Sequence, residues 1–160
     1  MKNGRLMRSV VIFLLLSSCS FFATPDKSPS AKNTYTISKL PSSWKEVKTQ
    51  DHDYVFYGPN GSSLMIQSFC NEFQSASLSN LAHTTFKSLD RSKIIEQKEF
   101  MLQDRAALMS KGEATIDGVR FRLTLVNTKR NNCYYDFLEV LPQQGTDSIT
   151  DQLIKELTFK

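Results

Sequence analysis

Residues 106–127 read AALMSKGEATIDGVRFRLTLVN, and this stretch decides the fold. Asp117-Gly118 is a strong signal for a two-residue hairpin turn between two strands. The expected strands run over 106–116 and 119–127. A turn of this length fixes which residues stand opposite each other. The resulting pairs are small or apolar on one face and polar or oppositely charged on the other, which are favourable cross-strand pairs. The pairs are Ile116 with Val119, Ala114 with Phe121 and Gly112 with Leu123 on one face, and Glu113 with Arg122 and Thr115 with Arg120 on the other.

The next strand, expected over 133–141, reads CYYDFLEVL. It is apolar on both faces except at Asp136 and Glu139. A strand that is apolar on both faces is typical of the middle of a sheet that is covered from two sides. We therefore expect this strand to be central.

Before the hairpin, strand signals dominate. Short strands are expected over 35–37 and 44–47, and a hairpin joins 54–57 to 64–70 through Gly58-Pro59-Asn60-Gly61, followed later by a strand over 94–101. Between them Ser77 is a suitable N-cap for a helix. The apolar residues Leu78, Leu81, Ala82, Phe86 and Leu89 recur at helical spacing, and His83 lies off that face. A last helix is expected over 147–157, with Ile149, Leu153 and Leu157 on its buried stripe.

This order of elements predicts an α+β domain, a mostly antiparallel sheet flanked by helices. The chain resembles the PsbP-like superfamily of α/β/α sandwiches. The resemblance lies in Leu40-Pro41-Ser42-Ser43-Trp44, the turn Gly58–Gly61, Asp117-Gly118, the strand Cys133–Phe137 and a terminal helix ending at Phe159. It implies an accessory or adaptor protein without catalysis, and it carries over no catalytic residue.

The N-terminus has the layout of a secretory signal. Lys2, Arg5 and Arg8 precede the apolar run 10–16 without an intervening acid. Seven residues rise only about 10 Å as a helix, against a hydrocarbon core of roughly 30 Å. A permanent transmembrane helix is therefore not expected here.

The four residues that end this leader are Leu16-Ser17-Ser18-Cys19. They resemble the lipobox of bacterial lipoproteins. The resemblance implies removal of residues 1–18, diacylglyceryl transfer to the Cys19 thiol and fatty-acyl chains such as palmitate at the new terminus. Two or three chains hold a protein on a bilayer far longer than one. In bacteria with two membranes, the residue after the lipidated Cys influences sorting. Ser20 is not the Asp associated with inner-membrane retention, so an outer-membrane destination is favoured if the source has an outer membrane.

The mature chain divides into a tether over 19–33 and one globular domain over 34–160. The tether is rich in Pro, Ser and Ala, which is typical of a flexible spacer. Of 20 Lys and Arg residues the leader removes three, so 17 remain against 16 acids and the mature net charge is +1. A nucleic-acid-binding domain needs clustered positive charge, so we expect no nucleic-acid partner.

Cys70 and Cys133 are the other two cysteines. Export places them in an oxidising compartment, where paired thiols form disulfides. Each stands at the end of an expected strand. We expect a structural Cys70–Cys133 disulfide, the alternative being two buried free thiols. No CxxC motif indicates redox chemistry.

Asp136 interrupts an apolar strand, and a buried carboxylate needs a partner. We expect a structural ion pair with Arg120 or Arg122 on the preceding strand, ahead of Arg105. A catalytic role is the alternative. Lys129-Arg130, expected in a loop at a hairpin tip, either faces solvent or contacts anionic groups.

No metal site is expected, because His52 and His83 lack ligand spacing. Asp51-His52-Asp53 reads as a polar bend, with weak cation binding as the alternative. No GxSxG, P-loop or dinucleotide motif is present, so we expect no cofactor.

Three functions are compatible with the sequence. The favoured one is a membrane-anchored, non-catalytic accessory or binding lipoprotein of the cell envelope, with an unidentified envelope protein as partner. The alternative is a small envelope enzyme with a cleft that the sequence does not reveal. A purely structural lipoprotein is a third possibility.

Overall fold

A computed structural model describes residues 31–144 and 148–160 of the chain. The strands are β1 (Tyr35–Ile37), β2 (Lys45–Val47), β3 (Tyr54–Tyr57), β4 (Ser63–Cys70), β5 (Lys93–Leu102), β6 (Arg105–Ile116), β7 (Val119–Arg130), β8 (Cys133–Pro142) and β9 (Leu157–Phe159). The helices are α1 (Leu78–Lys87) and α2 (Thr150–Glu156), with short 3₁₀ turns η1 (Lys32–Thr34) and η2 (Pro59–Gly61). The α+β class predicted from the sequence is confirmed.

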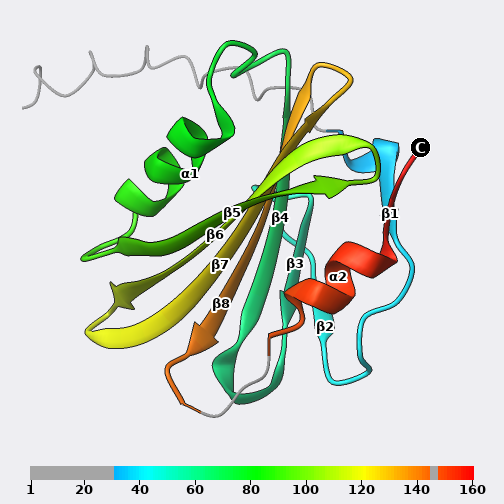
Figure 1. Ribbon diagram of the computed structural model, residues 1–160. Coiled ribbons are helices and arrows are strands. Elements are labelled where there is room, and N and C mark those ends of the chain that lie inside the picture. The colour runs from blue at the N-terminus through cyan, green and yellow to red at the C-terminus, as the bar shows by residue number, and fades with distance from the viewer. Residues whose placement is uncertain (1–30, 145–147) are drawn as a thin grey trace, which may run out of the picture.

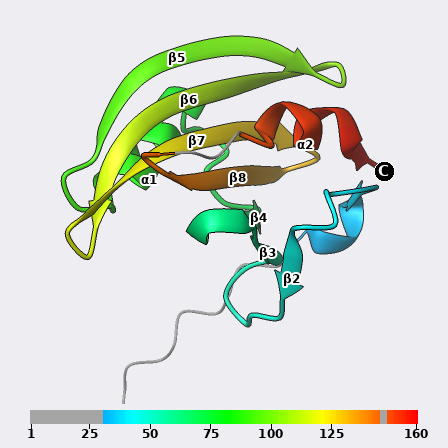
Figure 2. The same cartoon turned by 90° about the horizontal axis from the view of Figure 1, so that it is seen from below.

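Seven strands form one antiparallel sheet in the order β2-β3-β4-β8-β7-β6-β5, and β1 pairs with β9 in a second, two-stranded sheet. The large sheet bends in an arc, with β5 at one end and β2 at the other (Figure 2). β8 is the middle strand and is largely buried on both faces, as its apolar sequence predicted.

The β6–β7 hairpin has the register that Asp117-Gly118 predicted. Ile116 pairs with Val119, and Gly112 with Leu123. Gly112 is required for a further reason, because a Cβ there would lie 2.3 Å from the Lys93 carbonyl oxygen and 2.3 Å from the Phe86 ring. The glycine therefore lets α1 approach the sheet closely.

The two helices cover opposite faces of the sheet (Figure 1), and each closes its own apolar core. Ser77 caps the N-terminus of α1, as predicted, and its side chain accepts a hydrogen bond from the backbone N–H of Asn80. The buried face of α1 contributes Ala82 and Phe86, and His83 is exposed. The core under α2 is larger and includes Ile149, Leu153 and Leu157, the stripe expected for the last helix.

The last helix is shorter than its expected range of 147–157. It spans Thr150–Glu156, and the chain then extends as β9 beside β1. Leu157 and Phe159 are buried while Thr158 between them is exposed, which is the alternation of a strand. The expectation of a helix ending at Phe159 was wrong, because Leu157 also fitted the helical stripe. Within the described ranges no helix is long and apolar enough to cross a membrane.

Candidate functional site

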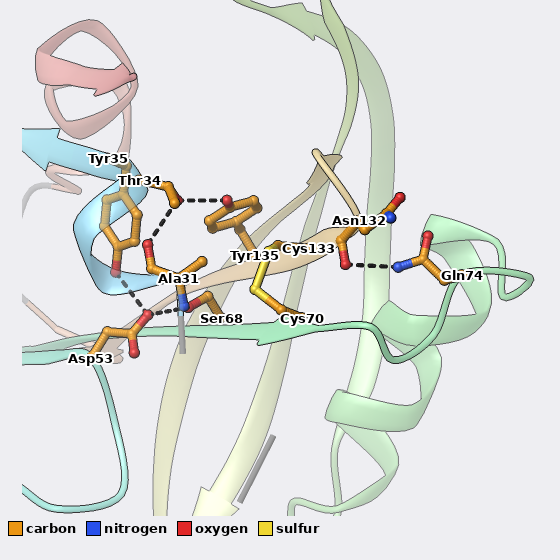
Figure 3. The surroundings of a disulfide bond; sticks show 10 residues. All are labelled: Ala31, Thr34, Tyr35, Asp53, Ser68, Cys70, Gln74, Asn132, Cys133 and Tyr135. Carbon is orange, nitrogen blue, oxygen red and sulfur yellow. Dashed lines mark hydrogen bonds between the residues drawn. A yellow bond between two sulfur atoms is a disulfide. The ribbon is translucent and has the colours of Figure 1, made fainter. Parts of the chain in front are cut away.

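Cys70 and Cys133 form the predicted disulfide, with a sulfur–sulfur distance of 2.05 Å (Figure 3). The two residues stand directly opposite each other in the antiparallel pair β4–β8. The bond therefore links the last residue of β4 to the first residue of the central strand β8. Cys19, the predicted lipidation residue, lies outside the described residues.

A buried polar cluster beside the disulfide fixes the start of the domain (Figure 3). The Ala31 backbone N–H donates to Ser68 Oγ at 2.7 Å, and Ser68 Oγ donates to Asp53 Oδ2 at 2.5 Å. The Tyr35 hydroxyl donates to the same carboxylate oxygen at 3.0 Å. Burial, followed by the charge of Asp53, raises the pKa of Tyr35 well above its ordinary value.

This cluster adds residues 31–33 to the domain, whereas the sequence placed them in the tether. Ala31 is 3% exposed. The same polar cluster also explains the Asp51-His52-Asp53 triplet. Asp53 turns into the core while Asp51 is exposed, so the triplet is a polar bend before β3. Among residues 31–144 and 148–160, no three potential ligands cluster around a metal position.

The expected ion pair of Asp136 with Arg120 or Arg122 is wrong. In the β7–β8 register Asp136 stands opposite Asn127, while Arg122 stands opposite Leu141 at the far end of the strand. Asn127 Nδ2 donates to Asp136 Oδ1 at 2.9 Å, and Thr85 Oγ1 of α1 reaches Oδ2 at 3.5 Å. Arg105 is no partner either, because it begins β6, two strands away from β8.

Asp136 is thus held by neutral donors beneath α1. Burial raises the pKa of its carboxyl to about 6, although hydrogen bonds from Tyr134, Asn127 and Thr85 oppose the rise. Asn127 Nδ2 also donates to the Tyr134 hydroxyl at 2.7 Å, and burial raises the pKa of that phenol strongly. The β7–β8 register could have been predicted from the sequence, because Asn-Asn is suited to a two-residue hairpin turn. Asn131 and Asn132 do form such a turn, and both have positive φ.

Glu139 is a buried carboxylate to which the sequence assigned no role. It is 0% exposed and faces α2. It accepts hydrogen bonds from Ser148 Oγ at 2.5 Å, the Ile149 backbone N–H at 2.7 Å and Thr150 Oγ1 at 2.6 Å. Three charge-assisted bonds therefore hold the beginning of α2 on the central strand.

Lys129 and Arg130 belong to β7 and not to a loop, contrary to expectation. Lys129 Nζ donates to the carbonyl oxygens of Phe73 at 2.6 Å and Gln74 at 3.1 Å, and also to that of Ala76. Arg130 makes an ion pair with Asp104 at 3.2 Å. Lys129 therefore holds the segment before α1 against the sheet, and Arg130 contacts the turn between β5 and β6.

A groove lies between α2 and the strands β5 and β6. Its volume is about 550 Å³. Phe100, Met109 and Ile154 form an apolar floor, and the charged lining residues are Glu96, Lys98, Lys111, Asp151 and Lys155. A smaller hollow of about 310 Å³ adjoins it and extends toward Arg122, Thr124 and Thr150. An apolar floor with a few polar groups is the usual composition of a ligand site.

The groups whose pKa the surroundings raise lie elsewhere in the domain. They are Tyr35 and Tyr54 near the domain start, and Tyr134 and Asp136 beneath α1.

The layered arrangement of a curved antiparallel sheet between two helices is the PsbP-like fold. The cyanobacterial PsbP protein (CyanoP) of Synechocystis sp. PCC 6803 superposes with a TM-score of 0.63 at 12% identity, over 83% of this chain and 90% of that one. A structure from Bacteroides thetaiotaomicron VPI-5482 gives 0.54 at 16% identity, over 84% of this chain and 47% of that one. No family model and no curated protein matches the sequence.

Proposed function

We propose that this chain is a lipoprotein of the bacterial cell envelope, exported, cleaved before Cys19 and anchored through acyl chains on that residue. The order of the first 19 residues supports it, with cations, a short apolar run and Leu16-Ser17-Ser18-Cys19. The observation that carries the proposal from the folded domain is the Cys70–Cys133 disulfide, because such bonds persist in oxidising compartments outside the cytosol.

The anchor accounts for how the domain is held at a membrane. Ala31, the first residue that the structure describes, is buried, and about a dozen positions separate it from the acylated Cys19. A chain of that length spans at most about 40 Å when fully extended. The domain therefore stays close to the bilayer, at the outer membrane where the cell has one.

At the membrane the domain acts as a non-catalytic binding or accessory protein. The groove beside α2 supports this role, since it offers an apolar floor and charged side chains while the perturbed titratable groups lie elsewhere. Crosslinking in intact membranes followed by mass spectrometry identifies a protein partner. Capture that depends on groove residues supports the role, and turnover of a captured compound contradicts it.

The anchoring is tested by metabolic labelling with a fatty-acid probe. The Cys19→Ala variant should take up no label and remain unprocessed or mislocalised. Ser18→Ala keeps a small residue before the cleavage point and serves as the control, with labelling like that of the natural chain. Equal labelling of the natural chain and Cys19→Ala would overturn the lipoprotein assignment.

A further inference from the structure

We propose that the groove between α2 and β5–β6 binds an anionic amphiphile with a single hydrocarbon chain and a carboxylate or phosphate head. The inference rests on the binding role proposed above and names its ligand class. It does not depend on the lipid anchor, so each can fail without the other.

The floor of the groove is an open edge of the core under α2. Phe100, Met109 and Ile154 are only partly buried, and all three pack against that core. A hydrocarbon chain laid on them would remove this apolar surface from water, which is favourable in proportion to the area covered. Methionine adapts to chains of different shape, and Met109 is one of the three floor residues.

Three lysines surround this floor. Lys98 stands directly opposite Met109 in the β5–β6 pair, Lys111 follows Met109 by two residues on the same face, and Lys155 adjoins Ile154 on α2. All three are exposed. Within residues 31–144 and 148–160 none of their ammonium groups has a hydrogen bond or ion pair.

The charge balance of the lining selects the head group. Glu96 and Asp151 also line the groove, so the three lysines leave a net charge of +1. A single anionic head would be attracted to these lysines, whereas a cationic head would be repelled by the same excess positive charge. The volume of about 550 Å³ lies within the range of roughly 300–1,000 Å³ usual for small-molecule sites.

Methyl NMR of the methionines tests the proposal on the full mature chain in a neutral maltoside detergent. Met109 reports on the groove, and Met101, on the opposite face of β5 and 66% exposed, reports on micelle contact. Octanoate and octyl phosphate should each shift the Met109 methyl signal to saturation and leave Met101 unchanged. The tighter of the two identifies the head group. Octyl glucoside, with the same chain and no charge, should bind at least ten-fold more weakly.

Lysine variants make the test specific. Lys111→Gln with Lys155→Gln should weaken octanoate binding at least ten-fold. The matched control, Lys48→Gln with Lys87→Gln, removes the same charge from exposed positions outside the groove and should bind as the natural chain does. The proposal is overturned if Met101 and Met109 respond alike, if octyl glucoside binds as tightly as octanoate, or if both double variants bind equally.

Discussion

Asp136 shows that a carboxylate inside a sheet can be stabilised without a cation. Its neighbours Asn127, Tyr134 and Thr85 are neutral, and burial holds the pKa of the carboxyl near 6, above the ordinary 3.8. A carboxyl with a raised pKa favours the folded state most when it is protonated. Its contribution to stability is therefore complete below about pH 4 and is lost as the pH rises through 6.

Asp136→Asn should consequently leave the domain at pH 7.5 as stable as the natural chain, or more stable. The gain is at most about 3 kcal/mol, because a shift of one pKa unit corresponds to about 1.4 kcal/mol and water reaches part of the side chain. Below pH 4 the gain should vanish. Urea unfolding between pH 4 and 8 measures it. If Asp136→Asn instead lowers the free energy of unfolding by several kcal/mol at pH 7.5, Asp136 has a cationic partner after all.

Glu139 differs from Asp136, because its carboxyl group accepts three hydrogen bonds from the beginning of α2. Replacing it with Ala leaves the Ile149 N–H and the hydroxyls of Ser148 and Thr150 without their acceptor. Hydrogen bonds to a charged group contribute about 1.5–3 kcal/mol each, so Glu139→Ala should lower the free energy of unfolding by roughly 3 kcal/mol or more. Glu139→Gln keeps one acceptor oxygen and should lose less.

Hydrogen exchange at the amides of α2, together with urea unfolding, measures this effect. Asp151→Asn is the control, because Asp151 is an exposed carboxylate on the same helix and its replacement should change stability by less than about 0.5 kcal/mol. Unchanged exchange in Glu139→Ala would show that α2 is held by its apolar contacts alone.

At the residue scale, the sequence identified which positions are unusual but not always their partners. The cysteine pair was predictable, because export and strand ends leave few alternatives. Asp136 was assigned a cation from its charge alone, although counting across the Asn131-Asn132 turn brings Asn127 opposite it. Glu139 was missed because its donors, Ser148, Ile149 and Thr150, lie at and just before the start of α2. No pairing rule places these residues beside a given strand position.

Among the elements, the hairpin register was predictable to the residue, since two-residue turns leave no freedom in pairing. α1 followed from apolar spacing and its Ser77 cap. The end of the chain did not, because three residues of strand pair with β1, more than a hundred positions away. A periodic pattern carries no information about a partner so distant.

The disulfide acts at the scale of elements, since it joins β4 to β8 where the sheet already makes them neighbours. Cys70→Ser with Cys133→Ser should therefore preserve the fold. It should lower the free energy of unfolding by about 4 kcal/mol, the value expected for closing a loop of 63 residues in the unfolded chain.

Urea unfolding of the exported protein measures the loss. Alkylation under denaturing conditions without a reductant provides the control, because a formed disulfide leaves both cysteines unlabelled. Labelling of both residues in that experiment would contradict the bond in the exported protein, whatever the stability of the variant.

For the whole molecule, the α/β/α layering followed from the order of elements and from the two-sided apolarity of β8. The groove did not follow, because its floor comes from β5, β6 and α2, segments that a sequence pattern does not bring together. The length of α2 decides how much of the sheet stays uncovered. A seven-residue helix, followed by a strand, leaves Phe100 and Met109 accessible beside it.

We predict that the destination of the whole molecule depends on Ser20, which lies outside the described residues. Ser20 directly follows the predicted lipidation residue, Cys19. Resemblance to bacterial lipoproteins implies that the residue after the acylated Cys influences sorting between two membranes. In a two-membrane host, Ser20→Asp should move the protein from the outer-membrane to the inner-membrane fraction of a density gradient. Ser20→Ala should stay with the outer membrane, and both variants should keep the stability of the natural domain. If Ser20→Asp and Ser20→Ala fractionate alike, sorting does not depend on this residue, and the proposed outer-membrane location loses its support.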